Sequence, residues 1–124
     1  MISISTDSAP KAIGPYSQGI AFQDLLFLSG QVAINPMSGN IEATGIEGQT
    51  EQVMKNLQNV LQAGGSDLSK VLKCTVFLQD LEDFAAFNKV YGSHFGSVPP
   101  ARSTVQVAKL PRGAKVEIDV IAQK

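Results

Sequence analysis

The sequence predicts an α/β fold of the α+β kind, with one sheet covered on one face by two helices. Three features indicate it: short alternating segments typical of strands, two segments with helical apolar spacing, and Gly or Pro residues at most boundaries. The chain has 124 residues, of which 44% are hydrophobic. This length suits a single domain over residues 1–124 with one hydrophobic core.

The first expected element is a hairpin of residues 19–23 with residues 25–34. The second segment, LLFLSGQVAI, is a long strand candidate. Asn35-Pro36 and Ser38-Gly39 follow it, and these are turn residues. We therefore expect the long strand to end at residue 34.

The first helix is predicted from apolar residues spaced at i, i+1, i+4, i+7 and i+8. These are Val53, Met54, Leu57, Val60 and Leu61. Thr44-Gly-Ile-Glu47 resembles a capping box at the helix start, and Gly64-Gly65 is typical of a helix end.

Residues 71–78 alternate like a strand, and Asp80 is then placed to cap a second helix. The second helix is expected to end before Gly96 and Pro99-Pro100. Its apolar face consists of Leu81, Phe84, Phe87, Tyr91 and Phe95. We interpret this aromatic stripe as core.

Two last strands are expected at residues 103–109 and 115–123, joined through Leu110-Pro-Arg-Gly-Ala114. In the long strand 25–34 and in residues 116–122, both alternating sets of side chains are largely apolar. Strands of this kind are buried on both faces, yet two helices cover only one face. We therefore expect an obligate homo-oligomer whose sheets pack against one another.

Charge and hydropathy argue against two classes of partner. Ten Lys and Arg residues against eleven Asp and Glu give a net charge of −1, and the basic residues are scattered, which argues against nucleic-acid binding. No apolar run approaches the ~20 residues of a membrane span. The N-terminus lacks the pattern of a signal peptide, so the expected location is cytoplasmic.

Cys74 is the only cysteine and His94 the only histidine. We therefore expect no internal disulfide and no metal site. Cys74, in an alternating segment, is interpreted as a small core residue. His94, near the end of the second helix, is interpreted as a partner of the helix dipole.

Two charged residues near the C-terminus suggest chemistry. Arg102 opens a strand, and fifteen residues later Glu117 lies among apolar residues of the last strand. A guanidinium is a planar fork that matches a carboxylate, while burial among branched side chains should raise the pKa of a glutamate and suit it to acid–base work. The pair predicts a site for a small carboxylic acid, although the spacing alone also fits a structural ion pair.

Five segments resemble, in order and separation, the reactive intermediate deaminase family (RidA or YjgF type). They are Ile13–Gln18, Leu28–Gln31, Asn88, Pro100–Ser103 and Val116–Ile118. The likeness covers nearly the whole chain. One such tripeptide is weak evidence, but five in register with the expected elements are specific.

The resemblance implies a chorismate-mutase-like fold: a mixed six-stranded sheet with two helices on one face, assembled as a homotrimer with active sites between subunits. In that fold the last strand lies between the first long strand and strand 71–78, antiparallel to both. The last strand and the strand of Arg102 then start at opposite ends of the sheet. Arg102 and Glu117 of one chain should lie far apart, so a cleft that holds both would need two chains.

The activity that the resemblance implies is hydrolysis of 2-imino acids or their enamine tautomers, such as 2-iminobutanoate and 2-iminopropanoate, to 2-keto acids and ammonia. Arg102 would clamp the substrate carboxylate. Glu117 would orient the attacking water, accept its proton and help to protonate the departing nitrogen. No cofactor is implied, because the imine carbon is already electrophilic.

The remaining site residues are also carried over from the resemblance. Tyr16 would close the pocket, with a packed loop aromatic as the alternative. Ser29 and Gly30 would let backbone amides approach a ligand, with a strand bulge as the alternative. Asn88 would contact the substrate or bond a loop. Thr104 stands where many relatives have a cysteine, and we expect its backbone carbonyl to serve.

Two other functions remain open. A non-catalytic trimer could use the same cleft to bind or sense 2-keto acids, although the presence of Glu117 argues against it. An RNA-cleaving or translation-inhibiting activity has been attributed to relatives, yet the scattered charges and the lone histidine offer little machinery for it. The expected partners are therefore a small 2-imino or 2-keto acid and further copies of the chain.

Overall fold

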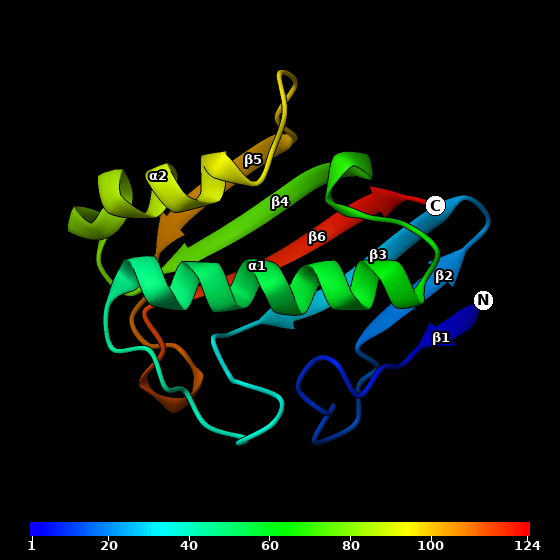
Figure 1. Cartoon of the computed structure of the whole chain (residues 1–124), viewed down its shortest axis with the longest axis horizontal. Coiled ribbons are helices and arrows are strands. Elements are labelled where there is room, and N and C mark those ends of the chain that lie inside the picture. The colour runs from blue at the N-terminus through cyan, green and yellow to red at the C-terminus, as the bar shows by residue number, and fades with distance from the viewer.

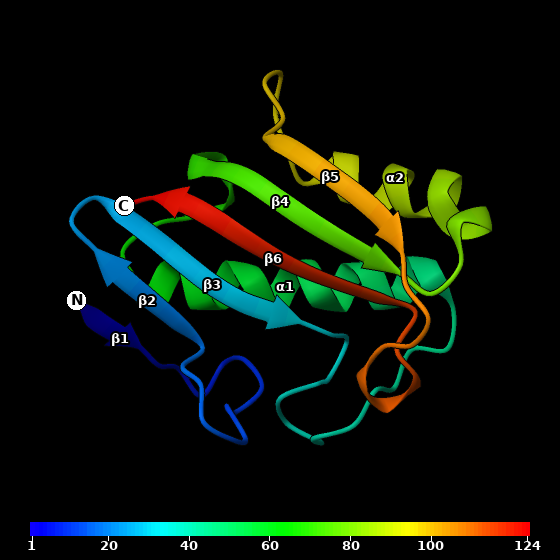
Figure 2. The same ribbon diagram turned by 180° about the vertical axis from the view of Figure 1, so that it is seen from behind.

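A computed structural model describes all 124 residues and shows one six-stranded sheet in the order β1-β2-β3-β6-β4-β5. Both α-helices lie on the same face of this sheet (Figure 1). In the opposite view no helix crosses in front of the strands (Figure 2). The two layers that the sequence predicts are therefore confirmed.

The strands are β1 (Ile2–Ile4), β2 (Gly19–Phe22), β3 (Leu25–Gln31), β4 (Val71–Leu78), β5 (Ala101–Gln106) and β6 (Val116–Gln123), and the helices are α1 (Ile46–Ala63) and α2 (Phe84–Ser93). Short 3-10 turns lie at Leu68–Lys70, Leu81–Asp83 and Pro111–Gly113. Only β4 and β5 are parallel, so the sheet is mixed. β1, which pairs with β2, has no counterpart among the strands expected from the residues.

β6 is the central strand. It runs antiparallel to β3 on one side and to β4 on the other, as the resemblance implied. Its residues alternate in burial: Val116, Ile118 and Val120 lie in the core, whereas Glu117 and Asp119 on the other face are partly exposed. The two carboxylates therefore point away from the helices.

β3 ends three residues earlier than expected because a bulge interrupts it. Leu28 pairs with Val120, but Gln31 pairs with Ile118, so β3 has one more residue than β6 between these pairs. The extra residue falls at Ser29-Gly30. The bulge interpretation is confirmed, and it shortens the regular ladder.

The chain that follows β3 is tied to α1 by a buried amide. Asn56 is fully buried and donates from Nδ2 to the backbone oxygens of Ile34 at 2.9 Å and Val32 at 3.3 Å. Its Oδ1 accepts from Gln52 at 2.9 Å. Each side of the amide thus has a partner, which removes most of the cost of burial.

The capping box expected at α1 is wrong. The helix begins at Ile46, and its N-cap is Gly45, which has extended backbone angles and no side-chain cap. Thr44 stands one position too early to cap. Gly64-Gly65 ends the helix as expected, because Gly64 is the C-cap and Gly65 adopts a positive φ of 84°.

The second helix is preceded by a turn of 3-10 helix that Asp80 caps, accepting from the backbone N–H of Glu82 at 2.9 Å. Only part of the aromatic stripe is core. Phe87 and Tyr91 are buried, whereas Phe84 is 37% exposed. Phe84 therefore lies outside the core cluster.

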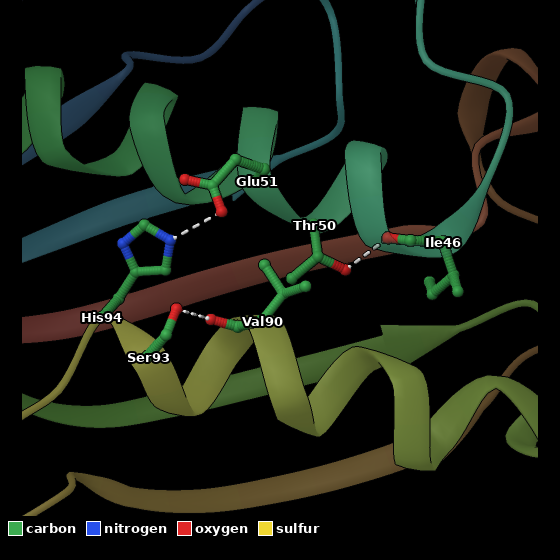
Figure 3. A network of polar contacts seen from close by, with 6 residues as sticks. All are labelled: Ile46, Thr50, Glu51, Val90, Ser93 and His94. Atoms are coloured by element: carbon green, nitrogen blue, oxygen red, sulfur yellow. Dashed lines mark hydrogen bonds and ion pairs between the residues drawn. The ribbon is translucent and has the colours of Figure 1, made fainter.

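The seam between the two helices carries polar contacts (Figure 3). His94 is the C-cap of α2, and its Nε2 lies 3.1 Å from Oε2 of Glu51 on α1. Nearby, Ser93 donates to the Val90 carbonyl at 2.6 Å and Thr50 donates to the Ile46 carbonyl at 2.7 Å. His94 thus links two helices, beyond the dipole role expected of it.

The face of the sheet away from the helices is rich in apolar side chains. Phe22 is 51% exposed, Val105 45% and Phe27 42%. We call this surface the open face. It is the face for which the sequence predicts a second layer. None of the helices combines the length and apolar character of a membrane span.

Candidate functional site

Most of the site residues predicted from the sequence line one of two separate hollows, and Ser29 and Thr104 line neither. The first, of about 350 Å³, is lined by Tyr16, Gly30 and Glu117 among others. The second, of about 440 Å³, is lined by Asn88 and Arg102 with Tyr91, Gly92, Pro99 and Pro100. We call them the acid hollow and the arginine hollow.

Arg102 and Glu117 do not meet within one chain. Arg102 is paired with Cys74 on β4, whereas Glu117 is paired with Phe77. Two strand spacings of about 4.8 Å and three residues of about 3.3 Å put their Cα atoms roughly 14 Å apart. Their side chains also lie on opposite faces, since Arg102 contacts α2 and Glu117 points away from the helices. The expected separation is therefore observed.

Glu117 has the electrostatic character expected of an acid–base group. Burial raises the pKa of the Glu117 carboxyl, and the negative charge of Asp119 raises it further. Asp119 follows two residues later on the same face of β6, and burial raises its pKa as well. The desolvation of Glu117 was expected from the sequence, whereas Asp119 was missed, although its i+2 spacing was an available signal.

Gly30 leaves the space that the Glu117 carboxylate occupies. A Cβ at position 30 would lie 2.5 Å from Oε2 and 2.9 Å from Cδ of Glu117, closer than real side chains approach. The bulge in β3 brings the two strands into this arrangement. Because Gly30 has no side chain, the carboxylate of Glu117 on the neighbouring strand has room beside it.

Ser29 anchors the loop that carries Tyr16. Its Oγ donates to the backbone oxygen of Ser17 at 2.6 Å, and its backbone N–H donates to Gln18 at 3.0 Å. Tyr16 is 51% exposed, so its ring is not packed against the rest of its own chain. Its side chain stands beside the acid hollow and is free to contact a ligand.

Gln18 is a buried polar residue of the acid hollow that sequence reasoning did not single out. It is 5% exposed. Its Oε1 accepts from the Thr6 N–H at 2.7 Å, and its Nε2 donates to Pro10 at 2.7 Å and Thr6 at 3.0 Å. Gln18 therefore holds the first loop against the sheet. Its position at the end of the segment Ile13–Gln18 was the available signal.

Asn88 binds the guanidinium of Arg102. Its Oδ1 accepts from Nη1 at 2.7 Å, so the alternative that Asn88 bonds a loop is wrong. The one ion pair within the chain is His94 with Glu51, and no carboxylate pairs with Arg102. A guanidinium has five N–H donors, and most of those on Arg102 remain available to an anion.

Thr104 turns its side chain toward the helices. Its Oγ1 is buried and has no hydrogen-bond partner. Two residues from Arg102 on the same face of β5, it fills the interior beside Val76. The Thr104 hydroxyl therefore faces the interior of its own chain, and the role of the backbone carbonyl stays a prediction.

Tyr91 and Cys74 lie beneath Arg102. Burial raises the pKa of both the Tyr91 hydroxyl and the Cys74 thiol. Cys74 and Arg102 are the polar neighbours of the Tyr91 hydroxyl, yet neither meets hydrogen-bond geometry with it. Cys74 is 1% exposed, which confirms its interpretation as core, and its raised pKa disfavours the nucleophilic thiolate.

The mixed sheet with both helices on one face defines a chorismate-mutase-like α/β protein. The sequence model of one family, described as Endoribonuclease L-PSP, matches residues 6–124. The chain therefore belongs to this family, which is the RidA or YjgF family that the sequence motifs resemble. No group of three metal-ligating side chains gathers in the structure.

Relatives with several names match almost the whole chain. Protein DfrA of Myxococcus xanthus is 52% identical over 97% of this chain and 93% of its own length. Reactive Intermediate Deaminase A of Arabidopsis thaliana, a chloroplastic protein, is 49% identical over 96% of this chain and 64% of its own. The 2-iminobutanoate/2-iminopropanoate deaminase of Mus musculus is 45% identical over 96% of this chain and 88% of its own.

Solved structures of relatives superimpose closely. A putative endoribonuclease from Thermotoga maritima has a TM-score of 0.97 and 46% identity, covering 100% of this chain and 98% of its own. TdcF of E. coli, solved with bound serine, has a TM-score of 0.94 and 38% identity, covering 100% of this chain and 99% of its own. The deaminase names among these relatives support a reactive intermediate deaminase role.

Proposed function

We propose that the protein hydrolyses 2-imino acids, such as 2-iminobutanoate and 2-iminopropanoate, or their enamine tautomers, to 2-keto acids and ammonia. The observation that carries the proposal is the pair of complementary groups in the two hollows. Glu117 is a carboxyl group with a raised pKa, and Arg102 is a guanidinium without a carboxylate partner. A substrate with an anionic end and an imine carbon needs a guanidinium to bind the anion and a carboxyl group to transfer protons.

The site is proposed to form between the subunits of a homotrimer. The open face exposes aromatic side chains to water, which is energetically unfavourable. Packing three copies with these faces inward would bury them. β5 is an edge strand, so the arginine hollow lies at the rim of the sheet. The arginine hollow of one subunit would there adjoin the acid hollow of its neighbour.

Arg102 would bind and orient the substrate. Its free N–H groups would make two parallel hydrogen bonds to the carboxylate, a geometry that lysine lacks. This clamp would fix the C=N carbon a short distance from the Glu117 carboxylate of the adjacent subunit. Holding the reactants in this way lowers the entropic part of the barrier.

Glu117 would move the protons. Water adds its oxygen to the C=N carbon while Glu117 accepts a water proton. The carboxyl then protonates the nitrogen, the C–N bond breaks, and ammonia leaves as the remaining hydroxyl loses its proton to form the keto group. A raised pKa suits a group that must both accept and return a proton near neutral pH. Tyr16 would cover the bound substrate.

A coupled assay tests the proposal. An amino acid oxidase generates the imine, and formation of the keto acid is timed with the wild type, Arg102→Ala and Glu117→Ala. We expect the wild type to accelerate hydrolysis, Arg102→Ala to abolish the acceleration, and Glu117→Ala to reduce it by about 100-fold or more. Lys89→Ala is the charge control, because it removes an exposed cation next to Asn88 on α2. No acceleration by the wild type would overturn the proposal.

The same experiment addresses a second candidate, a trimer that binds small acids without turnover. Two observations support this candidate. TdcF binds serine in its solved structure, and a Lactococcus lactis relative that is 49% identical is named Putative regulator AldR. Such a protein would bind 2-oxobutanoate in calorimetry through Arg102 and leave imine hydrolysis unaccelerated. Acceleration that depends on Glu117 would exclude it.

A further inference from the structure

We propose that Phe84, Phe87 and Tyr91 form an aromatic cradle that holds the guanidinium of Arg102 in its substrate-binding orientation, with Phe84 as a positioning residue. The inference rests on the proposed role of Arg102 as the carboxylate clamp. The central carbon of the guanidinium lies 5.0 Å from the ring centroid of Tyr91, 5.4 Å from Phe84 and 5.9 Å from Phe87. All three distances fall within the range of cation–π contact, about 6 Å.

The cradle is built on one stripe of α2. Residues 84, 87, 88 and 91 follow helical spacing and therefore face β5 together. Three of these positions supply rings, and Asn88 supplies the carbonyl oxygen that accepts from Nη1 at 2.7 Å. The helix thus places three rings around the guanidinium and accepts a hydrogen bond from one of its N–H groups.

Holding the guanidinium matters because an arginine side chain has many rotamers. A free arginine loses this freedom when it grips an anion, and the loss weakens binding. A guanidinium already confined by rings and an amide has less freedom to lose. Aromatic faces also attract the cation without competing with the substrate for its N–H groups. The cradle therefore keeps the donors free, whereas a carboxylate partner would occupy them.

Phe84 distinguishes a positioning role from core packing. Phe87 is fully buried and Tyr91 is 5% exposed, so replacing either would disturb the core. Phe84 is 37% exposed and fills little of the interior, yet its ring approaches Arg102 almost as closely as that of Tyr91. A change at Phe84 should therefore affect the guanidinium more than the fold.

The test compares Phe84→Leu with Phe84→Trp. Calorimetric titration with 2-oxobutanoate and the coupled assay should show Kd and KM raised about three- to tenfold in Phe84→Leu with kcat little changed, because one cation–π contact is lost. Phe84→Trp keeps an aromatic face and should retain wild-type values. Melting temperatures of both variants should stay close to that of the wild type. A purely structural role would change stability without this contrast in KM.

Leu81→Ala is the matched control. Leu81 precedes the same helix and is 46% exposed, but its backbone N–H bonds Gln106 at the far end of β5 from Arg102. Its removal should leave Kd and KM unchanged. Equal values for Phe84→Leu and wild type would overturn the cradle.

A second readout separates this inference from the proposed function. In nitrogen-edited NMR, the Nε–H group of Arg102 should be ordered in the wild type and in Phe84→Trp, with a chemical shift displaced by ring currents. In Phe84→Leu the same group should be mobile. This result requires no substrate. Failure of the wild type to act on imines would overturn the deaminase proposal alone, whereas an Arg102 signal insensitive to Phe84→Leu would overturn the cradle whatever the activity.

Discussion

The carboxylate of Glu117 occupies the space that a side chain at position 30 would need. A Cβ on Gly30 would lie 2.5 Å from Oε2 of Glu117. The backbone of Gly30 does not have a positive φ, so its conformation is open to other residues. Glycine is therefore required at this bulge for space.

Gly30→Ala should displace the Glu117 carboxylate and lower kcat by about tenfold or more, because a misplacement near 1 Å is costly to catalysis. The fold should persist, since the clash falls on the end of one side chain. Gly45→Ala is the control, because nothing lies within 4 Å of the point where its methyl group would stand. The coupled assay and thermal unfolding check both variants. Full activity in Gly30→Ala would mean that the position of the carboxylate does not matter.

The pH dependence of activity should follow Glu117. As a base it must be ionised, so kcat/KM should fall as the pH drops through its raised pKa. Asp119→Asn removes the like charge that contributes to the raised pKa, and the acidic limb of the profile should then move to lower pH. Profiles of kcat/KM for the two proteins give the comparison. An unmoved limb would show that Asp119 does not act on the catalytic carboxyl.

Asp119 should also affect stability, with a definite sign. Burial raises the pKa of its carboxyl above the ordinary 3.8, so the folded state binds this proton more tightly than the unfolded state. The stabilisation is fully present below the unfolded value and is lost as pH rises through the folded value. Asp119→Asn should therefore raise the melting temperature at pH 7 and change it little at pH 3. A lower melting temperature at pH 7 would mean that the charged form makes a favourable contact.

The spacing of apolar residues predicted the long elements well. Each of these elements buries either one face or both faces, and this burial leaves a regular pattern in the sequence. The strand 71–78 has the expected limits, and the helix over Val53 to Leu61 ends at Gly64 as expected. The misses have local causes. β1 is only three residues long, too short for an alternating pattern to stand out. The early end of β3 depends on a bulge, which is set by pairing with another strand.

The sequence predicted which residues belong to the candidate site better than it predicted what those residues contact. The branched apolar residues around Glu117 in the sequence predicted the raised pKa of its carboxyl, and burial in the sheet does raise it. The contacts of Arg102 were not predicted. Whether its side chain lies against α2 or on the open face depends on the register of β5 with β4. The aromatic stripe was interpreted as core alone, since nothing in helical spacing reveals that a guanidinium lies over it.

The open face should be an interface, and a charge placed on it should separate the subunits. Phe27 is 42% exposed and lies beside Ile121 at the centre of this surface. Phe27→Glu should convert a trimer into monomers that keep their circular dichroism spectrum, because an unpaired charge is costly to bury. Met37→Glu, in the loop after β3 and 94% exposed, should leave the assembly intact. Light scattering at micromolar concentration measures both. A monomeric wild type would remove the basis for a shared site.

The sharing of the site between chains can be tested by mixing two inactive variants. Arg102→Ala retains Glu117, and Glu117→Ala retains Arg102. If each site takes its guanidinium from one subunit and its carboxylate from the next, trimers reassembled from equal amounts of the two variants contain intact sites. Random assembly places the right neighbours together in roughly one interface of four, so about a quarter of the wild-type rate should return.

A double variant, Arg102→Ala with Glu117→Ala, supplies the control for this mixture. Reassembled with Glu117→Ala, it provides no Glu117 in any subunit and should recover no activity. Within one chain the two side chains lie on opposite faces of the sheet. A site confined to one subunit would leave the first mixture as inactive as the control, because neither variant carries both groups. Recovery in the first mixture alone would therefore require that neighbouring chains complete each other's site.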